Sequence, residues 1–239
     1  MRLLVIEHQD DAGPGVFAEG LQGCDVRTWR PDRAPAPDTA DLGALDAALV
    51  LGAAANVHER DAHPWMDADL RVVGELVRRR VPTLGVCLGA QLLAAAAGGG
   101  VRRAAAPEIG WYDVAVEASA HDDPLMGALA PGFTAFQWHS YESVPPADAT
   151  VLARSPRSLQ AFRLAGAPAW GIQFHAEVST ADAASWTEHH EMDPDAVAMG
   201  LDPVELQAEN EARMPGWNTV GRALFTRFLT TAARHRETA

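Results

Sequence analysis

The chain has 239 residues, of which 48% are hydrophobic and 21% are charged, a balance that supports a sizeable core and argues against disorder. Its net charge of −13 disfavours binding to nucleic acid and to anionic membrane surfaces, which are themselves negative. No apolar run approaches the roughly 20 residues needed to cross a bilayer, and the first apolar stretch, Leu3 to Ile6, is too short for a signal-peptide core.

The first half of the chain alternates short apolar runs with helix-like stretches. Strands are expected over 2–7, 24–29, 46–52 and 81–86, and helices over 13–23, 63–80 and 90–97. A proline-rich loop is expected over 30–45. Strands that alternate with helices predict an open, mostly parallel sheet with helices on both faces.

The middle of the chain changes to short strands joined by turns. These expected strands are 111–118, 133–141, 149–155, 159–166 and 168–175. They predict an antiparallel extension of the same sheet.

Strand signals stop after Val178. Ser179 to Asp182 resembles a capping box that opens a helix, and Asp202-Pro203 suits the start of another. An apolar stripe at helical spacing follows, made of Val220, Leu224, Phe225, Phe228 and Leu229. We therefore predict an α/β domain over 1–178 and a helical extension over 179–239 that packs on it.

The octapeptide LGVCLGAQ (84–91) places one of only two cysteines between two glycines, where a strand gives way to a helix. This is the layout of a nucleophile elbow, in which the turn leaves no room for side chains at Gly85 and Gly89. The helix N-terminus favours a thiolate at Cys87. The alternative is a small buried cysteine in a glycine-rich turn. The other cysteine, Cys24, is expected to be inert packing, and two cysteines without a disulfide framework favour a reducing, cytoplasmic location.

The segment GIQFHAEV (171–178) supplies a base and its orienting group. His175 and Glu177 are two residues apart, so on an extended chain their side chains face the same way. Glu177 could then accept a hydrogen bond from one imidazole nitrogen while the other faces Cys87. The alternative is a strand-end histidine beside a solvated glutamate. Together with the elbow, the catalytic interpretation is preferred.

Taken together, the motifs resemble the class I (triad) glutamine amidotransferase family. The elbow resembles that family's G-x-C-x-G-x-Q, with Gln91 in the glutamine position, and GIQFHAEV resembles its G-x-Q-F-H-P-E. VLGAAANVHE (50–59) stands where the family usually has a Gly-Gly-Pro loop. EIGWY (108–112) and FQWHSYE (136–142) resemble segments of stand-alone members related to the GMP synthase glutaminase domain. The similarity runs over about residues 1–178.

The resemblance implies a flavodoxin-like α/β fold and a cysteine-dependent amidase that needs no cofactor or metal. Cys87 would attack the side-chain amide of glutamine, His175 would move the proton, Glu177 would orient His175, and water would hydrolyse the thioester. Backbone amides of Leu88 and of the Gly52-Ala53 loop would form the oxyanion hole. The amino-acid end of the substrate would be held by Gln91, Trp138, His139, Ser140 and Tyr141.

Three departures from the family pattern bear on this expectation. Ala53-Ala54 replaces a glycine and a proline, so a positive φ there would strain the loop. Ala176 replaces the usual proline between His175 and Glu177, which we expect to loosen that segment. Tyr141 stands where related members often carry an aspartate, so the substrate could differ from glutamine.

Two further features have a possible role. His189 and Asp193 would lie one turn apart on a helix as a metal pair, although a solvated acidic face is the preferred interpretation. Trp111 and Trp138 flank the motifs and are expected near the pocket.

Three functions remain open from the sequence. The first is a glutamine-hydrolysing subunit that delivers ammonia to a separate synthase, since the chain contains no recognisable nucleotide-binding acceptor domain. The second is a γ-glutamyl peptidase or hydrolase with the same three catalytic residues, decided by the loops over 56–63 and 140–143. The third is a catalytically weak regulatory or binding subunit.

Overall fold

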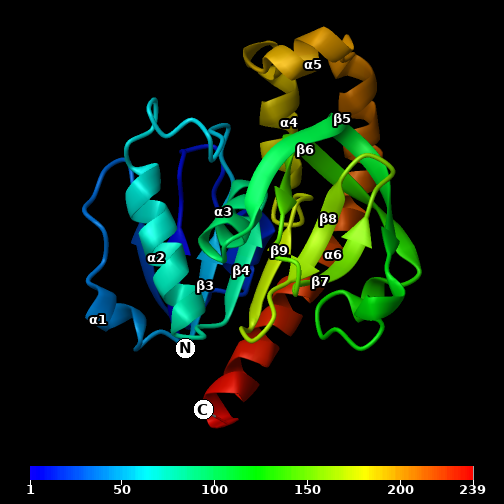
Figure 1. The fold of residues 1–239 in the computed structure, drawn as a ribbon. Coiled ribbons are helices and arrows are strands. Elements are labelled where there is room, and N and C mark those ends of the chain that lie inside the picture. Colours follow the sequence, from blue (N-terminus) through cyan, green and yellow to red (C-terminus); the bar gives the residue numbers. More distant parts are fainter. Residues whose placement is uncertain (239) are drawn as a thin grey trace.

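The computed structural model describes residues 1–238 as one mixed sheet between two layers of helices (Figure 1). In this described range, nine strands lie in the order β2-β1-β3-β4-β9-β8-β7-β5-β6. Their bounds are Arg2–Ile6 (β1), Asp25–Trp29 (β2), Ala47–Val50 (β3), Thr83–Val86 (β4), Gly100–Val116 (β5), Gly132–Val144 (β6), Thr150–Arg154 (β7), Leu159–Arg163 (β8) and Ala169–Ile172 (β9). The α-helices are Thr39–Leu42 (α1), Met66–Arg78 (α2), Leu88–Ala96 (α3), Thr180–Glu188 (α4), Pro194–Met199 (α5) and Pro203–Thr238 (α6). Short 3₁₀ turns cover Gly15–Glu19 (η1), Ala118–Ala120 (η2), Gly127–Leu129 (η3) and His190–Met192 (η4).

The sheet has a parallel half and an antiparallel half, as the sequence predicted. Strands β2, β1, β3, β4 and β9 pair in parallel, whereas β8, β7, β5 and β6 pair antiparallel. The chain moves outward from β1 to β2 and then returns to the other side of β1 to form β3. Ligands of open parallel sheets bind outside the carboxyl ends of the strands at such a switch point.

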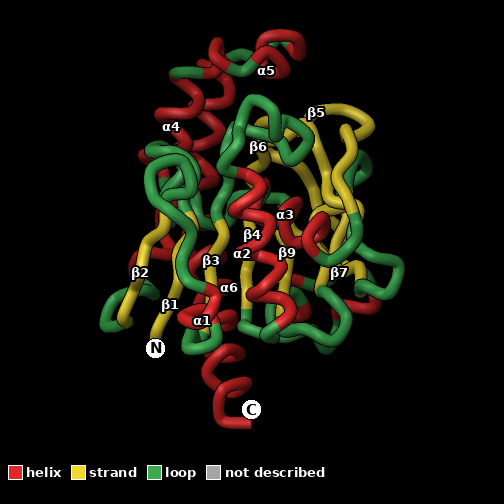
Figure 2. Tube along the Cα trace, turned by 60° about the vertical axis from the view of Figure 1, so that its left-hand side comes forward, coloured by secondary structure: helices red, strands yellow, loops and turns green. Residues whose placement is uncertain are grey.

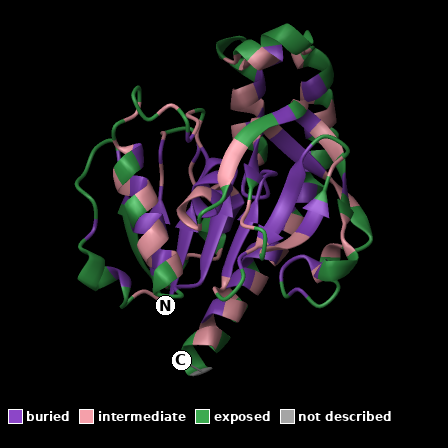
Figure 3. Ribbon diagram, in the orientation of Figure 1, coloured by how far each residue is buried: buried purple, intermediate pink, exposed green. Residues whose placement is uncertain are grey.

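Both faces of the sheet are buried, which explains why its parallel strands are apolar at every position (Figure 3). Leu4 and Ile6 of β1 face the side that α2 and α3 cover. Leu3 and Val5 face the opposite side, which α4 and α6 cover. The tube view shows the parallel strands lying side by side between these layers (Figure 2).

The C-terminal segment is helical, as predicted, and packs on the sheet. Ser179 and Asp182 form the expected capping box at the start of α4, and α6 begins at Pro203. Leu224, Phe225 and Phe228 of the predicted stripe are buried in the core. No helix in the described part of the chain is long and apolar enough to cross a membrane.

Four element boundaries differ from the prediction. The helix expected over 13–23 is only the short turn η1, because glycine and proline interrupt this stretch. The loop expected over 30–45 contains α1, which Asp38 caps. Strand β5 begins at Gly100 rather than at residue 111, with a bulge between Arg103 and Glu108. Strand β9 ends at Ile172, so His175 lies in the bend that follows it.

Candidate active site

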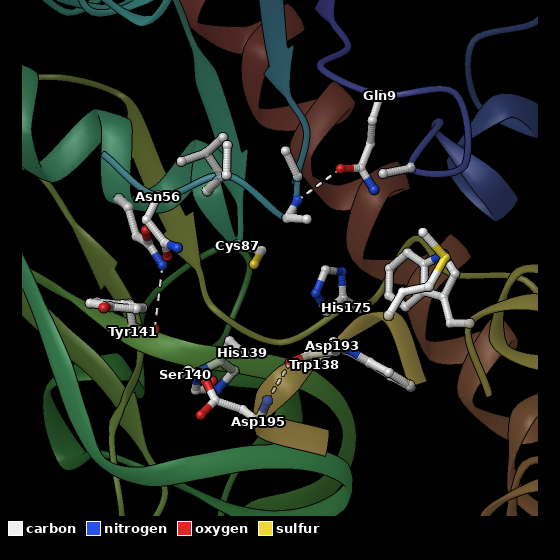
Figure 4. A pocket seen from close by; sticks show the side chains of 18 of the residues that line it. Gln9, Asn56, Cys87, Trp138, His139, Ser140, Tyr141, His175, Asp193 and Asp195 are labelled. Atoms are coloured by element: carbon white, nitrogen blue, oxygen red, sulfur yellow. Dashed lines mark hydrogen bonds between the residues drawn. The ribbon is translucent and has the colours of Figure 1, made fainter. Parts of the chain in front are cut away.

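A cavity of about 690 Å³ opens at the carboxyl edge of the parallel strands. The loop after β1 contributes Gln9, the loop after β3 contributes Ala53, and the turn after β4 contributes Cys87. His175 comes from the bend after β9, and Trp138 to Tyr141 come from β6 (Figure 4). Side chains that are far apart in sequence therefore converge on one pocket.

Cys87 occupies a strained turn of the kind predicted for an elbow. It has φ 51° and ψ −110° at the N-terminus of α3, a conformation that is uncommon for a residue with a side chain. Its amide donates to the carbonyl of Ile172 at 2.8 Å, which fixes the turn against β9. A Cβ at Gly89 would lie 2.0 Å from the carbonyl oxygen of Val50, and one at Gly85 would lie 2.5 Å from the Gly89 backbone. Both positions therefore require glycine.

His175 and Glu177 form a buried pair. His175 Nδ1 lies 2.7 Å from Glu177 Oε1, and both side chains are almost fully buried. The pairing that the sequence predicted on an extended strand is thus present, although the segment forms a bend. With Nδ1 engaged by the carboxylate, Nε2 is the nitrogen left for the pocket, and in the described residues it has no hydrogen-bond partner.

The segment from His175 to Val178 is held from two sides, so the expected loosening at Ala176 is not observed. Trp217 Nε1 of α6 donates to the carbonyl of His175 at 2.8 Å. The amide of Val16 donates to the carbonyl of Glu177 at 2.7 Å. A Cβ at Gly221 of α6 would lie 2.0 Å from the carbonyl oxygen of Ala176. The C-terminal helix therefore positions the backbone of the proposed base.

Cys87 and His175 face the same space (Figure 4). A Cβ built at Gly52 would lie 3.4 Å from Cys87 Cβ and 3.4 Å from His175 Cε1, so this glycine fits between the two residues. Burial opposes the charged form of His175, but the negative charges of Glu177 and Cys87 outweigh it and raise the pKa of His175 to about 10. This environment favours a thiolate–imidazolium pair.

The pH dependence of activity follows from this raised pKa. Activity of the wild-type protein should fall as the pH rises through about 10, because the imidazolium that donates to the leaving group then loses its proton. In Glu177→Gln one of the charges that raise the pKa of His175 is absent, so the alkaline limb should move to lower pH. The measurement is kcat/KM for glutamate release against pH, with Glu188→Gln, an exposed position on α4, as the matched charge control. An alkaline limb that stays in place in Glu177→Gln would contradict this account of His175.

The predicted oxyanion groups border the pocket without the strain expected at Ala53. The described residues with positive φ include neither Ala53 nor Ala54. The amide of Ala54 donates to Gln9 Oε1 at 2.8 Å, so a side chain from the loop after β1 fixes this loop. Within residues 1–238 the amides of Ala53 and Leu88 donate to no other group, which leaves both available to an oxyanion. Gln9 was not foreseen from the sequence because it acts across the switch point.

The residues expected at the amino-acid end of the substrate also line the cavity. Gln91 Nε2 donates to the carbonyl of Tyr141 at 3.3 Å, while its buried Oε1 has no partner in the described structure. Beneath the cavity, His139 Nε2 lies 3.3 Å from the carboxylate of Glu108. Glu108 is ionised: burial opposes its charge, but His139 and neighbouring hydroxyl groups lower its pKa.

The rest of the cavity wall was not foreseen from the sequence. It includes Arg103 of β5, Trp186 of α4, and Met192, Asp193 and Asp195 of the segment that leads into α5. Arg103 pairs with Asp195 at 2.5 Å. No local motif marks these residues, because the C-terminal helices bring them to the site only in the folded chain.

Two minor expectations are corrected. His189 and Asp193 do not share a helix, since α4 ends at Glu188 and η4 lies between them. Among the described residues no group of three potential ligands is arranged to hold a metal ion. Trp138 lines the cavity, but Trp111 does not; it packs against Phe136 and Trp217 and donates to Asn210 at 2.9 Å.

Comparison with known proteins matches residues 20–189 to the family described as glutamine amidotransferase class-I. One of the two subunits of the glutamine-hydrolysing GMP synthase of Ignicoccus hospitalis is 39% identical over 111 residues, which cover 46% of this chain and 57% of the relative. A γ-glutamyl-L-1-hydroxyisopropylamide hydrolase of a Pseudomonas species is 30% identical over 156 residues, which cover 62% of this chain and 52% of the relative. The alignments therefore span only about half the length of these relatives.

The similarity in three dimensions extends over almost the whole chain. The crystal structure of a glutamine amidotransferase from Methylobacillus flagellatus superposes with a TM-score of 0.81 at 27% identity. It covers 96% of this chain and 94% of that one, so the C-terminal helices lie within the matched region.

Proposed function

Because this chain belongs to the class I glutamine amidotransferase family, we propose that it hydrolyses the side-chain amide of glutamine or of a γ-glutamyl compound through a thioester on Cys87. The observation that carries the proposal is the cysteine at φ 51° on a helix N-terminus, facing a histidine whose other nitrogen is held by a buried glutamate. These are a nucleophile, a base and an orienting group in the arrangement that acyl transfer requires.

The reaction proceeds in two stages. The thiolate of Cys87 attacks the γ-carbonyl carbon, and the amides of Ala53 and Leu88 stabilise the oxyanion. The C–N bond then breaks, and His175 gives its proton to the departing nitrogen through Nε2. Water, activated by the now neutral His175, hydrolyses the thioester and releases glutamate. Glu177 keeps Nδ1 engaged throughout, so Nε2 always faces the reacting atoms.

Two versions of this reaction differ in the leaving group. In the first, ammonia leaves and is delivered to a separate synthase protein, as suggested by the relatives named as subunits of glutamine-hydrolysing GMP synthase. In the second, the leaving group is an amine, as suggested by the relative named for γ-glutamyl-L-1-hydroxyisopropylamide hydrolysis. A cavity of about 690 Å³ supports the second version, because it lies within the range of pockets that enclose ligands larger than an amino acid.

Covalent labelling tests the shared chemistry. The protein is incubated with the glutamine analogue 6-diazo-5-oxo-L-norleucine, and its intact mass is measured with and without excess glutamine. We expect a single adduct on Cys87 that glutamine suppresses and that Cys87→Ala and heat-unfolded protein do not form. An adduct that glutamine does not suppress would favour a larger γ-glutamyl substrate. No adduct on the folded protein would contradict the proposal and favour a regulatory or binding role.

A further inference from the structure

The wall of the cavity next to His175 is apolar and comes from the C-terminal segment. The rings of His175 and Trp186 meet edge-to-face with centroids 4.9 Å apart, and Trp186 packs against Trp138 at 5.9 Å. Both indoles line the cavity, as does Met192, whose side chain is 83% exposed. We refer to Trp138, Trp186 and Met192 as the indole wall.

The indole wall has no polar group left for a ligand. Trp186 Nε1 donates to the carbonyl of Asp11 at 2.9 Å, and Trp138 Nε1 donates to Asp193 Oδ2 at 2.9 Å. Both N–H groups are therefore occupied within the protein. What the two rings and the thioether of Met192 present to the cavity is apolar surface, which stabilises an apolar ligand and offers nothing to ammonia.

The charges beside the indole wall are negative. Asp11 and Asp193 border it, and the only arginine or lysine among the described residues that line the cavity, Arg103, is already paired with Asp195. A leaving group that carries a carboxylate would meet repulsion here with no free cation to offset it. A neutral alkyl group would meet none.

The chemistry of the proposed reaction places the leaving group against this wall. The departing nitrogen must lie within hydrogen-bond distance of His175 Nε2 to receive its proton, so any substituent on that nitrogen continues along the surface that adjoins His175. Resting on the proposed function, we propose that the indole wall is the subsite for the leaving amine, and that the preferred substrates are γ-glutamyl amides of small apolar alkylamines without a carboxylate. Cys87 forms the thioester, the C–N bond breaks, and the alkylamine leaves with the proton from His175; water then releases glutamate.

Three substrates that share one acyl group test this proposal. They are L-glutamine, L-γ-glutamyl-isobutylamide and γ-glutamyl-L-valine; the last two differ by a single carboxylate on the leaving group. All three give the same thioester on Cys87, so differences in kcat/KM for glutamate release report the leaving-group subsite. Burial of each methylene is worth roughly fourfold in affinity, and partial burial of four carbons should make the isobutylamide at least about tenfold better than glutamine. The valine compound should be the poorer of the two larger substrates.

Variants of the wall separate recognition from a structural effect. In Met192→Ser and Trp186→Phe, the ratio of kcat/KM for the isobutylamide to that for glutamine should fall by about threefold or more. Val204→Ser, which removes another exposed apolar side chain (77% exposed) outside the cavity, should leave the ratio unchanged. Turnover of glutamine without preference for the isobutylamide, or an unchanged ratio in both wall variants, would overturn the subsite. Failure of all three substrates together with no diazoketone adduct would instead overturn the proposed function itself.

Discussion

Cys87→Ser is expected to lose about ten-thousandfold or more in kcat/KM, nearly as much as Cys87→Ala. The reason lies in His175, whose pKa is raised to about 10 by the surrounding negative charge although burial opposes it. An imidazole that already carries a proton at neutral pH cannot accept one from a serine hydroxyl, which releases its proton far less readily than a thiol. The measurement is steady-state release of glutamate from glutamine at neutral pH.

A serine variant that kept several per cent of the wild-type rate would show that His175 acts as a neutral general base, against the ion pair inferred above. Thermal unfolding of both variants provides the control, because an oxygen or a methyl group in place of the sulfur should leave the fold intact. Loss of activity with an unchanged melting temperature would then report chemistry alone.

Gly89→Ala is expected to have the largest effect on stability, a loss of more than about 4 kcal/mol or complete failure to fold. The new Cβ would lie 2.0 Å from the carbonyl oxygen of Val50 in β3. That oxygen belongs to a strand buried on both faces, so it cannot move without shifting the sheet. The measurement is the soluble yield and the free energy of unfolding in urea.

Gly216→Ala is the matched control for this prediction. Gly216 lies on the exposed side of α6, and a Cβ there would meet nothing within 4 Å. Because alanine has a higher helix propensity than glycine, this change should stabilise the protein by up to about 1 kcal/mol. Equal stability of the two variants would falsify the claim that the elbow requires glycine for steric reasons.

The sequence by itself determined the local parts of this protein. The apolar runs, the glycines around Cys87 and the capping residues of α4 and α6 predicted the elements of the parallel half and the start of the C-terminal helices. It also predicted that Cys87 and His175 would meet, because both follow neighbouring parallel strands whose carboxyl ends share one edge. Such features are readable because strand and helix periodicity and turn sterics act over a few residues.

Only the tertiary structure decided the features that depend on distant segments. Strand β5 extends through Arg102 to Pro107 because β6 pairs with both its ends, not because these residues favour a strand. Trp217 and Gly221 of α6 hold the backbone beside His175, and Gln9 holds the loop at Ala54. The indole wall is likewise assembled from β6 and the C-terminal segment. The wall beside the leaving group thus depends on long-range packing, to which no local periodicity responds, whereas the nucleophile and its base are marked by motifs.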